Sequence, residues 1–126
     1  MKSNCVFQKP LTFEDLGDGR YYYNFHVVET EKKDPETGEV TPSFDYDQVV
    51  IVGKPTYHKV VAAVIRDKYS VDDELALINN YNESLKAKTK GNPESVKEYE
   101  EYLVFRTETK EMVKTDCIAY NILIEE

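Results

Sequence analysis

The sequence predicts an α+β domain in which a small, mostly antiparallel sheet of three to four strands carries about three helices on one face. Strand-like alternation is concentrated before residue 55, and helical spacing with capping signals follows it. A chain of 126 residues suits one domain. We therefore expect a single domain, 1–126, that is mainly β over 1–55, helical over 56–115, and closed by a returning strand over 116–126.

Two of the expected strands lie before the first hairpin. Residues 4–8 form a short candidate strand, and residues 20–32 alternate with a period of two and are rich in aromatic and β-branched side chains. The odd-numbered side chains of the second segment are the more apolar, so we place them in the core: Tyr21, Tyr23, Phe25 and Val27.

A charged hairpin connection is expected over residues 32–42. Pro35 suits an early turn position, and Gly38 can adopt a positive φ without steric cost. The return strand, 43–53, ends in the apolar run Val49 to Val52. That change of pattern predicts either a β-bulge near Asp47 and Gln48 or a strand whose second face becomes covered.

Two capped helices are the clearest local signal. Thr56 is a candidate N-cap for a helix over 57–68, and Ser70 is a candidate N-cap for the next one. Asp73 stands where a capping box has Glu or Gln, so the box is imperfect. The second helix either frays after Asn79 or continues to about Lys88, and its expected buried stripe is Val71, Leu75, Ile78 and Leu85.

A third helix is expected from Glu94 to about Lys114, with Asn92 and Pro93 as its start signal. Residues 117–124 then alternate in strand fashion, and we interpret them as a strand that returns to the sheet. The rival interpretation extends the third helix to the end of the chain.

The charge of the chain limits the classes of partner. The net charge is −8, with no basic half, which disfavours direct binding of nucleic acid or of an anionic membrane surface. The sequence has no apolar run long enough to span a membrane and no secretory leader, so a cytoplasmic location in a bacterial host is expected.

No motif predicts catalysis, a metal or a cofactor. His26, His58, Cys5 and Cys117 could supply ligands, but they lack the spacing of a zinc site. A Cys117–His26 nucleophile and base pair stays open, although an apolar setting for Cys117 would make its thiol inert.

The strand over 20–32 also offers a candidate protein-contact surface. Its even-numbered face holds Tyr22, Asn24 and His26, which combine aromatic and hydrogen-bonding groups suited to protein contacts. The alternative is that the helices cover this face.

The segment from Gly53 to Asn82, GKPTYHKVVAAVIRDKYSVDDELALINNYN, resembles a recurrent segment in small, uncharacterised phage and prophage proteins of gut Bacteroidales. The likeness covers residues 44–80 and is carried by Val52, Gly53, Pro55 and Thr56, followed from Lys59 by the pattern KVVxAxIRxKYSxDDExAxxxN. Some of those proteins accompany tail or tail-fibre genes. The resemblance therefore implies an assembly or accessory role and supplies no catalytic residue.

These observations together predict a non-enzymatic, phage- or prophage-derived accessory protein that binds another protein in virion or tail assembly. The partner would be a phage structural protein or a host protein, and a homo-oligomer or virion association is compatible with this role. One alternative is an acidic inhibitor of a host nucleic-acid-binding or defence protein. A second is a cysteine- or metal-dependent hydrolase.

Overall fold

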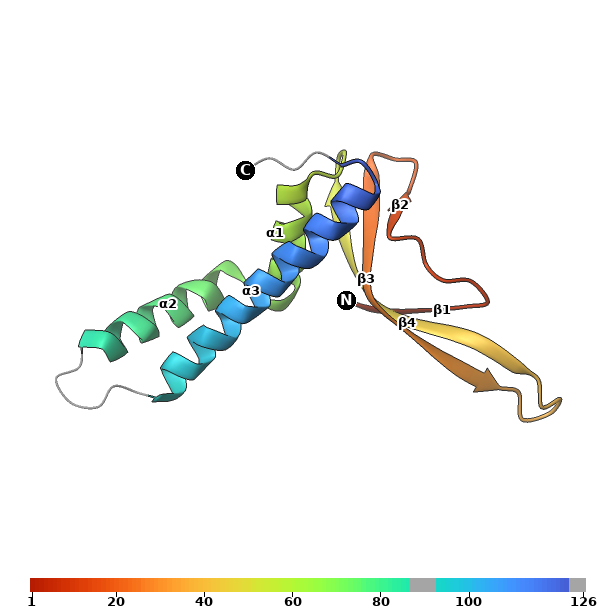
Figure 1. The fold of residues 1–126 in the computed structure, drawn as a ribbon, viewed down its shortest axis with the longest axis horizontal. Coiled ribbons are helices and arrows are strands. Elements are labelled where there is room, and N and C mark those ends of the chain that lie inside the picture. Colours follow the sequence, from red (N-terminus) through yellow and green to blue (C-terminus); the bar gives the residue numbers. More distant parts are fainter. Residues whose placement is uncertain (87–92, 123–126) are drawn as a thin grey trace. The chain divides into compact units, whose positions relative to one another are not determined.

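The computed structural model describes residues 1–86 and 93–122 of the chain. It divides into two compact units, Met1–Thr56 and Tyr57–Glu126, which are described separately. Within the described residues, the first unit holds four strands and the second holds three helices (Figure 1). The α+β class is confirmed.

The first unit is an antiparallel sheet with the strand order β1-β4-β3-β2. Its strands are β1 (Lys2–Val6), β2 (Phe13–Asp15), β3 (Arg20–Lys33) and β4 (Val40–Val52). Sequence analysis did not predict β2, because three residues are too few to show an alternating pattern. β2 exists through its pairing with β3, in which Phe13 faces Tyr23 and Asp15 faces Tyr21.

A two-stranded ribbon extends beyond the edge of β1, whose pairing with β4 ends at Ser43. β3 and β4 continue alone to the turn at 34–39 (Figure 1). The Glu36 N–H donates to Asp34 Oδ1 at 2.8 Å, and the Gly38 N–H donates to the Asp34 carbonyl at 2.9 Å. Pro35 lies in the turn and Gly38 has φ 74°, as the sequence predicts.

A β-bulge lies near the middle of the hairpin. Phe25 pairs with Asp47 and Val28 pairs with Asp45, so His26 and Val27 of β3 oppose Tyr46 alone. His26 takes up the irregularity with φ 52°, a conformation that few residues other than glycine adopt. The expected bulge therefore exists, but the extra residue is on β3 and not at Asp47–Gln48 of β4.

Aromatic side chains dominate the buried residues of this unit. Phe13, Tyr23 and Phe25 form a row, with ring centroids 5.0 Å and 5.2 Å apart. The buried apolar residues are Tyr23, Phe25, Phe44, Tyr46, Val49 and Ile51. Of the predicted core set, Tyr23 and Phe25 are buried, whereas Tyr21 and Val27 are half-buried.

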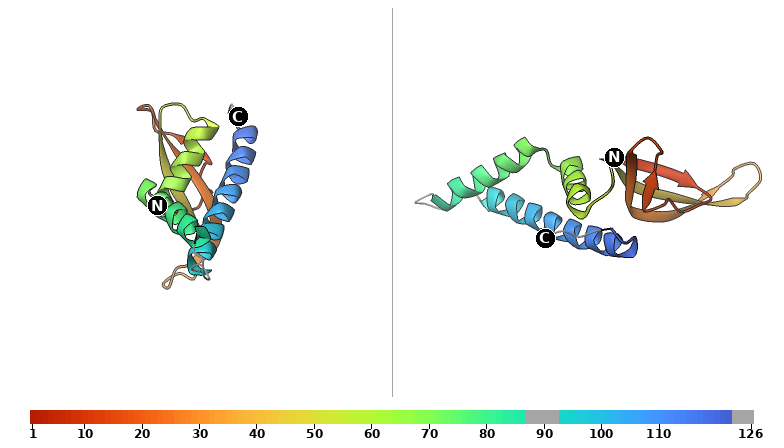
Figure 2. Two further views of the ribbon diagram at one scale, coloured as in Figure 1. Left: turned by 90° about the vertical axis from the view of Figure 1, so that its left-hand side faces the viewer. Right: turned by 90° about the horizontal axis from the view of Figure 1, so that it is seen from above.

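The second unit consists of α1 (Tyr57–Lys68), α2 (Val71–Lys86) and α3 (Pro93–Ala119). α3 is long enough to contact both other helices. α2 runs antiparallel to the first half of α3, as the ribbon views show (Figure 2). The Tyr81 and Tyr99 rings stack there with their centroids 4.3 Å apart. α1 packs on the second half of α3. The bounds of α1 agree with the prediction.

The predicted strand over residues 117–124 is wrong where the structure describes it. α3 continues to Ala119, because Cys117 extends a buried helical stripe that also contains Tyr102, Thr109 and Val113. The helix then ends in a Schellman motif: Asn121 has φ 56°, and the Ile122 N–H donates to the Cys117 carbonyl at 2.8 Å. Residues 123–124 lie outside the described residues.

Candidate functional site

The predicted contact surface on β3 is divided by the structure. Asn24 is only 3% exposed. Its Nδ2 donates to the Leu11 carbonyl at 2.7 Å, and its Oδ1 accepts from Gln48 Nε2 at 2.9 Å. The expectation that Asn24 faces a partner is therefore wrong, because a buried amide must be hydrogen-bonded and this one is satisfied within the sheet. Tyr22 is half-buried and His26 is exposed, so these two remain candidates.

His26 belongs to a polar clasp at the bulge. Its Nδ1 lies 3.0 Å from Asp47 Oδ2, and Lys2 Nζ lies 2.7 Å from Asp47 Oδ1. Burial raises the pKa of Asp47, but the hydrogen bonds from Lys2 and His26 outweigh it, so the net pKa is lowered. The clasp ties β1, β3 and β4 together where the ladder is irregular, which is a structural role.

The two cysteines have different environments. Cys117 is fully buried, and burial, with a smaller contribution from the Asp116 charge, raises the pKa of its thiol. Such a thiol is a weak nucleophile. Cys5 is half-buried and its Sγ donates to the Gln8 carbonyl at 3.1 Å. Within residues 1–86 and 93–122, no three His, Cys, Asp or Glu side chains form a group that could hold a metal ion.

The apolar stripe of α2 is exposed, which corrects the expectation that it is buried. The exposed fractions are 53% for Val71, 53% for Leu75, 37% for Ile78 and 64% for Leu85. Their spacing of i, i+4, i+7 and i+14 keeps all four on one side of the helix. We call these four residues the α2 stripe.

The α2 stripe is exposed because a different face of α2 meets α3. That second face carries Glu74, Leu77 and Tyr81, at i, i+3 and i+7. Tyr81 stacks on Tyr99, and the Tyr102 hydroxyl donates to Glu74 Oε1 at 2.5 Å. α2 therefore has two contact-capable faces, and α3 uses the one that is less apolar.

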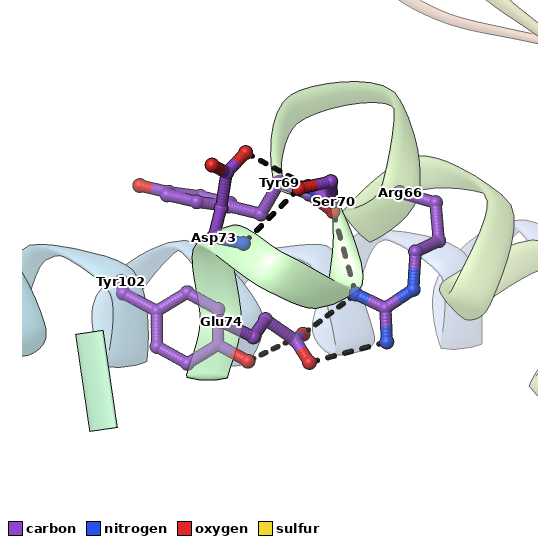
Figure 3. A network of polar contacts seen from close by, with 6 residues as sticks. All are labelled: Arg66, Tyr69, Ser70, Asp73, Glu74 and Tyr102. Atoms are coloured by element: carbon purple, nitrogen blue, oxygen red, sulfur yellow. Dashed lines mark hydrogen bonds and ion pairs between the residues drawn. The ribbon is translucent and has the colours of Figure 1, made fainter. Parts of the chain in front are cut away.

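The hinge between α1 and α2 fixes where the α2 stripe points. The Ser70 N–H donates to Asp73 Oδ2, and the Asp73 N–H donates to Ser70 Oγ, each at 3.0 Å (Figure 3). This is a complete capping box with aspartate in place of glutamate. The short aspartate side chain thus performs the reciprocal bond that the sequence pattern left in doubt.

Glu74 is the centre of the polar network at this hinge. Arg66 reaches it with both terminal nitrogens, Nη1 at 2.9 Å from Oε1 and Nη2 at 3.1 Å from Oε2 (Figure 3). The hydrogen bond from Arg66 is the main cause of the lowered pKa of Glu74, and the Tyr102 bond adds to it against the effect of burial. Burial, followed by the bond to Glu74, raises the pKa of Tyr102. The network joins the end of α1, the start of α2 and the middle of α3.

Sequence reasoning missed both the second face of α2 and the Glu74 network. The spacing of Glu74, Leu77 and Tyr81 was a detectable signal. The α2 stripe is more apolar, however, so it was predicted to be the buried face of the helix. The pairing of Arg66 with Glu74 crosses a hinge, and no periodic pattern within one helix can reveal it.

No known family model matches the chain, and neither a curated protein nor a solved structure was found that is similar to it. Among the described residues, no helix combines the length and the apolar character that a membrane crossing needs. The resemblance to phage and prophage proteins therefore stays a prediction.

Proposed function

We propose that this protein acts by binding protein and not by catalysis, as an accessory protein of phage or prophage virion or tail assembly. The observation that carries the proposal is the α2 stripe, four aliphatic side chains that the chain's own packing leaves exposed. An apolar stripe on an amphipathic helix is a recurrent protein-recognition surface. The phage context rests on the resemblance of residues 44–80.

The occupant that we assign to the α2 stripe is a second copy of this chain, paired antiparallel. The first turn of α2 holds three acids, of which Asp73 closes the capping box, Glu74 is bound by Arg66, and Asp72 is exposed; Lys86 is in the last turn. An antiparallel pair places the acidic end of each α2 beside the basic end of the other, which also opposes their helix dipoles. The apolar stripe and its flanking charges are therefore self-complementary.

Sedimentation or light scattering over a concentration series tests this assignment. The wild-type chain should form dimers with a dissociation constant in roughly the micromolar range, since each aliphatic side chain covered contributes up to about 1.5–3 kcal/mol. Leu75→Glu should weaken dimerisation at least tenfold without unfolding the protein, because the position is exposed. Ala76→Glu changes an exposed position outside the stripe and should leave dimerisation intact.

A wild-type chain that stays monomeric at about 1 mM would refute the second copy as occupant. Equal losses from Leu75→Glu and Ala76→Glu would refute the α2 stripe as the interface. The phage role has its own test, because affinity purification of the tagged chain from a lysogenic host should recover an identified phage structural protein. Recovery of none would count against that role.

Of the two alternatives, the acidic inhibitor needs its acids gathered on one face. Several acids are instead paired with neighbouring bases, as in Lys2 with Asp47, Arg20 with Asp18, and Arg66 with Glu74. The hydrolase alternative needs a reactive thiol or a metal. Metal analysis and thiol titration of the purified protein test it directly, and a bound metal or a fast-reacting Cys117 would support it.

A further inference from the structure

A pocket of about 470 Å³ lies between α1 and α3, within the helical unit. Its lining differs in charge from the chain as a whole. Among the described residues that line the pocket, four are cationic, Arg66, Arg106, Lys110 and Lys114, and Glu74 is the one acid. A chain with a net charge of −8 therefore concentrates positive charge at this place.

The cationic wall is built by α3. Arg106, Lys110 and Lys114 follow one another at i, i+4 and i+8, so they lie along one face of the helix. Three like charges on one helix face repel one another, and such spacing destabilises a helix slightly. Among the described residues, none of the three forms an ion pair with an acid, while Glu74 is engaged by Arg66. The charge of Arg106 helps to lower the pKa of Glu74, so Lys110 and Lys114 hold the charge that is most available to a ligand.

Arg106 also carries a buried hydrogen-bond donor that no described residue satisfies, which is a second indication of a ligand. Its guanidinium lies 5.8 Å from the centroid of the Tyr102 ring, and its Nε is buried without a hydrogen-bond partner among the described residues. Buried nitrogen donors are normally satisfied, and an exception needs an explanation. A guanidinium beside the pocket with an unmet donor suits an oxyanion, which arginine binds through more than one N–H.

The other side of the pocket is apolar and aromatic. Val61 and Ile65 of α1 contribute aliphatic surface. Tyr57 and His58, at the start of α1, add two rings packed edge to face, with centroids 5.3 Å apart. A bare inorganic ion would leave this surface unused, whereas an organic group attached to the anion would cover it.

We propose that this pocket is a binding site for a small organic phosphate, a phosphate ester with an apolar or aromatic body. The phosphate group lies against Arg106, Lys110 and Lys114, and the body lies against Val61, Ile65 and the Tyr57 ring. The phosphate carries up to two negative charges and several acceptor oxygens, which matches a wall of three cations better than a single carboxylate does. The inference does not depend on the α2 stripe, which lies on another helix.

Calorimetric titration at about 0.15 M salt tests the site with AMP, inorganic phosphate and adenosine as probes. AMP should bind with a dissociation constant below about 1 mM, inorganic phosphate more weakly, and adenosine more weakly than AMP. The double variant Lys110→Gln/Lys114→Gln should weaken AMP binding at least tenfold. Both lysines are exposed, so this variant should keep the wild-type fold and melting temperature.

Lys97→Gln is the control for lost positive charge on α3: it removes one charge, half of what the double variant removes, from an exposed position that does not line the pocket. It should change AMP binding less than twofold. The proposal is overturned if AMP fails to saturate, if the double variant binds AMP like the wild type, or if Lys97→Gln weakens binding as much as the double variant. Adenosine binding as tightly as AMP would remove the role of the cationic wall. Inorganic phosphate binding as tightly as AMP would remove the role of the apolar side.

Discussion

α1 and α2 present similar aliphatic stripes in the sequence, yet the structure uses them in opposite ways. α1 buries Val60, Val61, Val64 and Ile65. α2 buries no residue, although it is longer and its stripe is equally regular. Both helices pack on α3, so the difference lies in which face of each helix meets it.

The difference shows that an amphipathic pattern identifies an apolar surface, but not whether the chain itself covers that surface. In α1, the covering is intramolecular and contributes to the stability of the fold. In α2, the Glu74 and Tyr81 contacts hold the helix against α3 and leave the aliphatic stripe exposed. The same physical signal thus encodes a core in one helix and a candidate interface in the next.

The largest expected effect on stability comes from replacing one isoleucine of each stripe by alanine. Ile65→Ala removes a side chain that is 5% exposed and should lower the free energy of unfolding by about 3 kcal/mol. Ile78→Ala removes a side chain that is 37% exposed and should lower it by less than about 1 kcal/mol when the protein is dilute. Urea unfolding at low protein concentration measures both. Similar losses of stability would mean that the two stripes are equally buried in solution, which would contradict the difference between α1 and α2.

A smaller effect is expected at the contact that holds α2 in place. Glu74→Gln removes the charge that Arg66 and Tyr102 bind, and should lower the free energy of unfolding at pH 7 by about 1–2 kcal/mol. Because folding lowers the pKa of Glu74 below its usual 4.5, its contribution is complete above that value and is lost as the pH falls through the folded pKa. The difference between wild type and variant should therefore shrink towards zero in acid.

Unfolding measured from pH 7 down to pH 3 checks the Glu74 prediction. Glu83→Gln, at an exposed position of the same helix, is the control and should leave stability nearly unchanged throughout. A Glu74→Gln deficit that stays constant over this range would show that the charge of Glu74 is not what holds α2 on α3.

The smallest expected effect is at the hinge that separates the two helices. Ser70→Ala removes the hydroxyl that accepts from the Asp73 N–H and should cost about 1 kcal/mol, while Ser70→Asp should restore most of it because aspartate is also a good N-cap. Thermal unfolding of the three proteins provides the measurement. If alanine and aspartate behaved alike, the capping box would not be what starts α2.

Secondary structure and turns were predicted well from the sequence where residues close together in the chain determine them. The bounds of α1, the start of α2 at Val71, the turn with Pro35 and Gly38, and the β3–β4 pairing all follow from caps, turn residues and periodicity. The end of α3 was missed although Asn121, a residue that tolerates the left-handed conformation, was a readable stop signal.

Contacts between residues distant in the sequence determine which polar side chains are buried or paired and where the pocket forms. The burial of Asn24 depends on Gln48 and Leu11, and the engagement of Glu74 depends on Arg66 and Tyr102, all of which are distant in the sequence. The cationic pocket likewise needs α1 opposite the second half of α3.

By itself, the sequence determined the α+β class, the α1 and α2 starts and the hairpin, because short-range sterics and hydrogen bonds act between residues a few positions apart. Only the tertiary structure decided which face of α2 is covered and which cations lie together, because those outcomes depend on free-energy differences between alternative packings that a one-dimensional pattern does not contain.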